Sequence, residues 1–99
     1  MIRHVVSWRL RPESIEDKAE ATSAIAAALE PLVGVIPGLH SLTVRPNLAY
    51  HDKNWDAVLV ADFDSVASLI GYQEHPAHQA AGAVPRSLLT EQATVDYEV

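Results

Sequence analysis

The sequence contains no cysteine among its 99 residues. A chain without thiols forms no disulfide, offers no thiolate nucleophile and ligates no iron–sulfur cluster, and zinc ribbons are excluded as well. The absence fits a reducing compartment. The first residues also lack the charged, apolar and small-residue regions of a signal peptide, so we expect a cytoplasmic protein.

Positive charge is scarce. Seven basic residues stand against 13 acidic ones, which gives a formal net charge of -6, and Lys18 and Lys53 are the only lysines. The five arginines are scattered along the chain. A nucleic-acid binder needs a clustered positive surface to neutralise phosphates, so we expect no nucleic-acid partner.

Glycine is also sparse, and its four occurrences are dispersed: Gly34, Gly38, Gly71 and Gly82. None of them forms the G-x-G-x-x-G pattern that cradles a dinucleotide phosphate. We therefore expect no nicotinamide or flavin, and more broadly no haem, metal or other cofactor.

Long apolar runs are missing too. A helix that crosses a bilayer needs ~20 apolar residues, and no stretch of this sequence reaches that length. We therefore expect no membrane association of this kind.

The chain does contain enough apolar residues, 48%, to fold as one domain over residues 1–99. Side chains alternate along residues 2–10, with His4, Val6 and Trp8 on one face together with Ile2 and Leu10. A period of two is typical of a strand. The alternation therefore predicts a strand whose His4 face is the core face.

Further elements follow in the order strand, helix, strand, strand, helix, strand. A helix starts after Ser14 and ends by Gly34, with Pro31 bending its last turn. Strands are expected at 39–45, 57–63 and 89–99, with a loop at 46–55. The second helix starts after Ser65 and is broken at His75-Pro76, and 77–83 forms a short helical turn. This βαββαβ order predicts an α+β, ferredoxin-like fold with an antiparallel sheet and both helices on one face.

Such a fold leaves the second face of the sheet bare. Apolar side chains are expected on that face, namely Val5, Leu42, Val44, Val58 and Val60. A bare apolar face needs a partner, and the simplest partner is a second copy related by a two-fold axis. We therefore expect a homodimer in which two sheets pack into an α+β barrel.

The segment Tyr72-Gln73-Glu74-His75-Pro76-Ala77-His78 is the most informative in the chain. It places a phenol and two imidazoles within seven residues at a helix end, and His4 lies on the core face of the first strand. Histidine can move protons near neutral pH, and tyrosine can polarise a substrate oxygen. We expect Tyr72, His78 and His4 to meet in one apolar pocket, and we expect Val6, Trp8 and His75 to line it as well.

Each of these residues also has a structural interpretation. His75 can cap a helix, His78 can be a satisfied polar group under a loop, and His4 and Tyr72 can be hydrogen-bonded core residues. A metal held by the three histidines is a further alternative, although no acidic ligand has suitable spacing.

The chain resembles the stress-responsive A/B barrel (Dabb) family of the dimeric α+β barrel group. The matching pieces cover essentially the whole chain: Ile2-Arg3-His4-Val5-Val6, Ile36-Pro37-Gly38, Trp55-Asp56 before Val58-Leu59-Val60, Asp62-Phe63-Asp64-Ser65, and Tyr72-x-x-His75-Pro76-x-His78.

A plant branch of this family is a polyketide cyclase that catalyses an intramolecular aldol condensation without a cofactor. The resemblance implies that Tyr72 is the orienting phenol and His78 the base, with His4 in the pocket. The cyclase branch also has a tyrosine on the first helix and a histidine entering the third strand. This chain has Leu29 and Ala57 there, so Leu29 is expected in the pocket.

Two classes of function stay open. The chain is either a cofactor-free cyclase, isomerase or lyase that acts on a small apolar ketone, or a non-catalytic homodimer with a ligand-binding or stress role. A cofactor-free monooxygenase acting on an aromatic ligand is a further alternative.

Overall fold

The computed structural model describes all 99 residues, and its central element is strand β1 (Ile2–Leu10). Its side chains alternate as the sequence predicts, because His4, Val6 and Trp8 are buried while the intervening residues are more exposed. The strand boundaries match the expected range 2–10. This alternation gives the sheet a core face and an open face.

Three further strands pair with β1 in an antiparallel sheet: β2 (Leu39–Pro46), β3 (Ala57–Phe63) and β4 (Leu89–Glu98). The strand order is β2-β3-β1-β4, so β1 lies between β3 and β4. Together with the helices, this order is the ferredoxin-like α+β arrangement. The predicted fold class is therefore confirmed.

The first helix, α1 (Ile15–Leu29), begins where the sequence predicts. The side chain of Ser14 accepts a hydrogen bond from the Asp17 backbone N–H, which satisfies one of the free amides of the first turn. Pro31 cannot continue the α-helical hydrogen bonding, and the chain continues as a short 3₁₀ turn, η1 (Glu30–Leu32).

The second helical region is divided into three pieces: α2 (Val66–Glu74), α3 (Pro76–Ala81) and α4 (Ala83–Leu88). The Ser65 side chain caps α2, and the break at His75-Pro76 lies where we expected it. Helix α4 extends beyond the predicted turn at 77–83. It tolerates Pro85 because the residue lies in the first turn, where no backbone amide has a helical partner.

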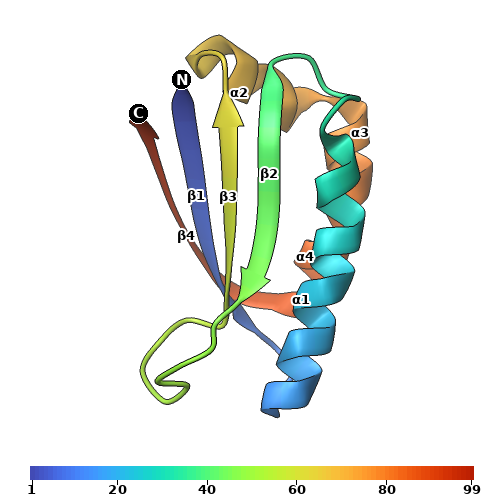
Figure 1. Cartoon of the computed structure of the whole chain (residues 1–99). Helices are drawn as coiled ribbons and strands as arrows, with labels where there is room; N and C mark the ends of the chain where they lie inside the picture. The colour runs from blue at the N-terminus through green and yellow to red at the C-terminus, as the bar shows by residue number, and fades with distance from the viewer.

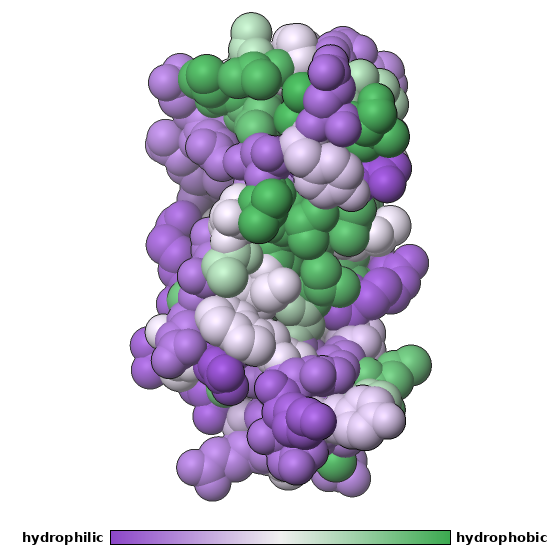
Figure 2. All heavy atoms as spheres, turned by 90° about the vertical axis from the view of Figure 1, so that its left-hand side faces the viewer, coloured by the Kyte–Doolittle hydropathy of each residue, from purple (hydrophilic) through white to green (hydrophobic).

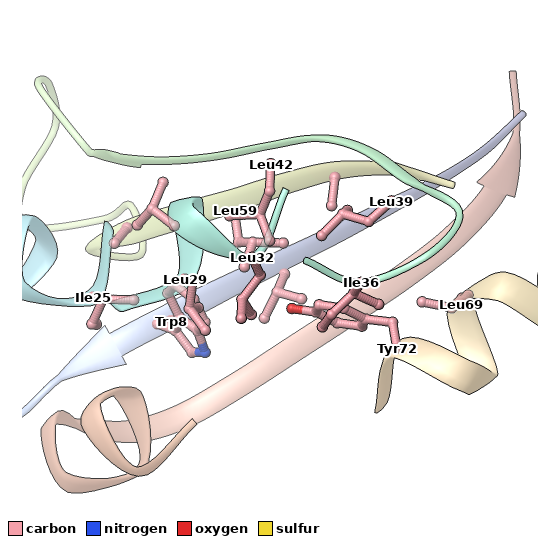
Figure 3. Packing of buried hydrophobic residues seen from close by; sticks show 14 of the residues in the cluster. Trp8, Ile25, Leu29, Leu32, Ile36, Leu39, Leu42, Leu59, Leu69 and Tyr72 are labelled. Atoms are coloured by element: carbon pink, nitrogen blue, oxygen red, sulfur yellow. The ribbon is translucent and has the colours of Figure 1, made fainter. Parts of the chain in front are cut away.

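All of the helices cover one face of the sheet, and α1 runs alongside it (Figure 1). Between the layers lies one cluster of 17 buried apolar residues, part of which is shown in Figure 3. The cluster includes Ile25 and Leu29 from α1 together with Leu69 and Tyr72 from α2. None of the helices combines the length and the apolar character that a membrane crossing requires.

The other face of the sheet is open, and Figure 2 shows an apolar patch at its centre, bordered by polar side chains. Val5 pairs with Val60 on β3 and with Val95 on β4, and directly paired residues share a face. We call Val5, Val58, Val60, Ala93 and Val95 the open-face patch.

Two residues assigned to the open face lie elsewhere. Leu42 and Val44 are buried in the core, opposite Ala61 and Leu59. The pairing register of β2 shifts between Leu39 and Ser41, and a shift of one residue exchanges the two faces of a strand. The prediction for Leu42 and Val44 was therefore wrong.

Burial of one side chain of α1 can be tested against an exposed side chain of the same type. Ile25 is 0% exposed and Ile15 is 55% exposed. We expect Ile25→Ala to lower the free energy of unfolding by about 2–5 kcal/mol, because it leaves a cavity in the core. Ile15→Ala, the control, should change it by less than about 0.5 kcal/mol. Urea denaturation measures both, and equal effects would contradict the packing of α1.

Candidate active site

His4 is held in place by the edge strand β4. The histidine is 5% exposed, and its Nδ1–H donates a hydrogen bond of 2.5 Å to Oδ1 of Asp96, its pairing partner on β4. A carboxylate only accepts hydrogen bonds, so the proton of this bond lies on Nδ1, and Nε2 remains available to the cavity. Asp96 thus fixes both the orientation and the tautomer of His4.

Tyr72 extends from α2 into the interior, as Figure 3 shows. It is 1% exposed, and its ring packs edge-on against Phe63 with the centroids 5.0 Å apart. Burial raises the pKa of Tyr72 to about 12, because a phenolate would lose its hydration there. The phenol therefore remains a hydrogen-bond donor at neutral pH.

His78 lies on α3 against the same phenol. The ring centroids of Tyr72 and His78 are 4.1 Å apart, and those of His4 and Tyr72 are 6.4 Å apart. Burial is the main cause that lowers the pKa of His78. Electrostatic interactions with His4 and Arg86 lower it further, while a hydrogen bond with the Gln73 backbone acts in the opposite direction. The imidazole is therefore neutral at neutral pH, and its buried Nδ1 has no hydrogen-bond partner.

These three side chains line one cavity of about 160 Å³ between the sheet and the helices. Val6, Trp8 and Leu29 also line it, so the structure brings together six of the seven predicted site residues. The lining combines apolar side chains with several convergent polar groups, and a concave site of this kind can hold a small molecule. Chemically, the arrangement offers a neutral base beside a protonated phenol.

His75 is the exception, and its assignment to this pocket was wrong. Its Nδ1 accepts a hydrogen bond of 3.0 Å from the Ala77 backbone N–H, so the residue caps α3. The residue before a proline adopts an extended backbone, which suits a cap. His75 instead borders a hollow next to Gly71 and Pro37. No group of three metal-ligating side chains is arranged to hold an ion.

Four polar residues at or behind the cavity did not enter the sequence prediction. Arg86, Gln92 and Thr94 line it, and Asp96 lies behind His4. Gln92 accepts a hydrogen bond of 3.0 Å from Trp8 Nε1–H. Residues 89–99 alternate, and Thr94 and Asp96 lie on the same side of that strand. Pairing this side with the His4 face of the first strand would have predicted both residues at the site.

A larger hollow of about 710 Å³ lies elsewhere, at the end of the open face next to the loop between β2 and β3. Trp55 borders it, and the Arg9 guanidinium lies 4.7 Å from the centre of that indole ring. Lys53 is the only titratable group in its lining, so this hollow offers no acid–base pair. The candidate active site is therefore the smaller cavity between the layers.

The fold and the cavity together define a ferredoxin-like α+β protein with a small acid–base pocket between sheet and helices. The sequence also matches the Stress Responsive A/B Barrel Domain over residues 2–99. The chain belongs to this family, which confirms the resemblance noted from its motifs. No curated protein matches the sequence significantly.

Solved structures share the fold over almost the whole chain. A dimeric ferredoxin-like protein of unknown function from Bacteroides fragilis is 28% identical, with a TM-score of 0.85 and coverage of 99% of this chain and 95% of that one. A similar dimeric protein from Thermobifida fusca is 30% identical, with a TM-score of 0.80 and coverage of 99% and 90%. A hydroxynitrile lyase from Passiflora edulis is 15% identical, with a TM-score of 0.77 and coverage of 99% and 92%, and at this identity the likeness concerns the fold alone.

The lowered pKa of His78 makes stability depend on pH. The ordinary pKa of histidine is 6.5, and burial lowers that of His78 in the folded state. Below pH 6.5 the unfolded chain therefore binds more protons at this position than the folded chain, so stability falls as the pH falls through this window. Between pH 7 and pH 5, we expect the free energy of unfolding to decrease less in His78→Gln than in the unmodified protein. Urea denaturation at several pH values measures this difference.

His51→Gln is the control, because His51 is an exposed loop residue. This variant should keep the pH dependence of the unmodified protein. An NMR titration in which His78 takes up its proton at or above pH 6.5 would contradict the effect of burial.

Proposed function

We propose that the cavity binds a small apolar ketone and that Tyr72 and His78 catalyse its enolisation without a cofactor, as in a cyclase, isomerase or lyase. The observation that carries the proposal is the contact between a phenol that stays protonated and an imidazole that stays neutral, both in the lining of one cavity.

The chemistry follows from the protonation states of the two groups. His78 takes a proton from the carbon next to the carbonyl, and the bonding electrons move onto the carbonyl oxygen. Tyr72 donates a hydrogen bond to that oxygen as negative charge develops on it. His4, oriented by Asp96, offers Nε2 as a further hydrogen-bonding group in the pocket. The resulting enolate can be reprotonated, or it can attack a second carbonyl in an aldol closure.

The alternative is a ligand-binding protein without catalysis, which the same cavity supports. The two functions differ in one observable, because an enzyme of this kind exchanges the protons next to the ketone carbonyl whereas a binding protein only holds the ligand. The lyase from Passiflora edulis is an enzyme built on the same fold, although the likeness extends no further than the fold.

We also propose that a second copy of the chain covers the open-face patch across a two-fold axis. The patch is apolar and lies on an otherwise bare sheet face, and small domains bury too little surface to leave such an area exposed. The relatives from Bacteroides fragilis and Thermobifida fusca are described as dimeric, at 28% and 30% identity. The two sheets would then form the barrel.

Catalysis is tested with acetophenone in deuterated water. We expect the protein to accelerate deuteration of the methyl group, followed by NMR, and His78→Ala and Tyr72→Phe each to lower that rate by about 10²–10⁴ because each removes a proton-transfer or oxyanion-stabilising group.

The matched controls are His51→Ala and Tyr50→Phe, which alter exposed loop residues and should leave the rate unchanged. Thermal denaturation verifies that all four variants fold. Binding of acetophenone without exchange would establish the binding protein instead of the enzyme.

The dimer is tested with Val60→Asp, which places a charge in the middle of the open-face patch. An unpaired buried charge should weaken association by at least about 100-fold. Sedimentation equilibrium at low micromolar concentration should give about twice 10.8 kDa for the unmodified protein and one chain mass for the variant. Val35→Asp, at an exposed turn away from the sheet, should leave the dimer intact. A folded monomer of the unmodified protein would refute the proposal.

A further inference from the structure

Arg86 on α4 is a positive charge that lines the candidate active site without a carboxylate partner. Four of the seven basic side chains form ion pairs, namely Arg3 with Asp62, Arg9 with Glu91, Lys18 with Asp56 and Arg45 with Glu30. Arg86 forms none. Its only hydrogen bond runs from Nη2 to the Gln79 backbone carbonyl, at 2.9 Å. The guanidinium is thus oriented but keeps free donors.

The guanidinium of Arg86 occupies space that is free because residue 82 is glycine and has no side chain. A Cβ atom at position 82 would stand 2.6 Å from Nη1 of Arg86 and 3.1 Å from the His78 carbonyl oxygen. The backbone of Gly82 is ordinary, with φ of -63°, so its conformation does not require glycine. The missing side chain therefore matters for the placement of the arginine beside the cavity.

Arg86 is the side chain in the cavity lining that stays positively charged at every pH of interest. His78 is neutral at neutral pH, and the carboxylate of Asp96 is engaged by His4 and does not line the cavity. The protein as a whole carries a formal net charge of -6, which repels anions in general. An anionic ligand would therefore need a local cation, and the planar fork of a guanidinium matches a carboxylate geometrically.

We propose that Arg86 binds a carboxylate group of the ligand, so that the cavity accepts a small ketone that also carries a carboxylate. This inference rests on the proposed function, because it assigns the substrate class of the same site. The apolar ketone end lies among Tyr72, His78 and Trp8, and the carboxylate lies at the exposed Arg86. A cavity of about 160 Å³ has room for one aromatic ring, since an engineered apolar cavity of ~150 Å³ holds benzene.

The test compares two probes of nearly equal shape, 4-acetylbenzoate and the neutral 4-acetylbenzamide, in NMR titrations of the full chain. We expect the carboxylate to bind at least about tenfold more tightly than the amide, since hydrogen bonds to charged groups are the stronger ones. Arg86→Gln should abolish this preference, and added salt should reduce it. Arg11→Gln is the matched control, because Arg11 is also free of ion pairs but does not line the cavity, and it should keep the preference.

Gly82→Ala provides a second variant that keeps the charge but displaces the guanidinium, and it should lower the preference. Equal affinity of the unmodified protein for the two probes would overturn the proposal. A preference that survives Arg86→Gln would overturn it as well, as would the absence of binding of both probes at about 10 mM. Failure of acetophenone exchange would instead refute catalysis and leave the carboxylate preference as a separate result.

Discussion

The alternation of side chains along β1 is the constraint on which the rest of the structure depends. This strand pairs on both sides, with β3 and with β4, and its inward row carries His4, Val6 and Trp8. A slip of one residue would turn that row onto the open face and bring Arg3 into the core. Burial therefore fixes the register, and the register in turn places His4 opposite Asp96. Packing of the core and assembly of the site are consequences of one pairing.

Burial also explains why an acid and a base coexist in the cavity. A poorly hydrated environment favours the neutral form of every titratable group, so it raises the pKa of Tyr72 and lowers that of His78. The two shifts act in opposite directions on the pKa scale but have the same physical cause. The phenol keeps its proton and the imidazole remains free to accept one. Burial is thus the main cause that prepares both groups, and Arg86 adds to the lowered pKa of His78.

Local patterns in the sequence predicted the fold and much of the site. The alternation at 2–10 and the apolar run at 57–63 marked their strands because both signals lie within one element. The grouping of His4, Tyr72 and His78 followed from the core face of β1, the helix phase and the break at Pro76. The structure brings the three side chains together, and their role as a site stays a prediction.

What the sequence did not reveal depends on pairing between distant segments. Leu42 and Val44 were assigned to the wrong face because the shift of register in β2 has no local signal. Arg86 and Asp96 were missed because each reaches the site only through the packing of α4 or the pairing of β4. The capping role of His75 was one of two interpretations that its sequence context allowed, and only the hydrogen bond to Ala77 distinguished them.

Two polar side chains of the cavity lining and the carboxylate behind His4 come from β4, an edge strand whose side chains are almost all exposed. Gln92, Thr94 and Asp96 face the helices yet contribute little to the apolar core. Substitutions at exposed positions usually cost little stability. The hydrogen-bonding character of the pocket can therefore diverge between relatives while the scaffold is conserved. A single ferredoxin-like framework could in this way serve chemically distinct ligands, with specificity evolving at the margin of the sheet rather than in its interior.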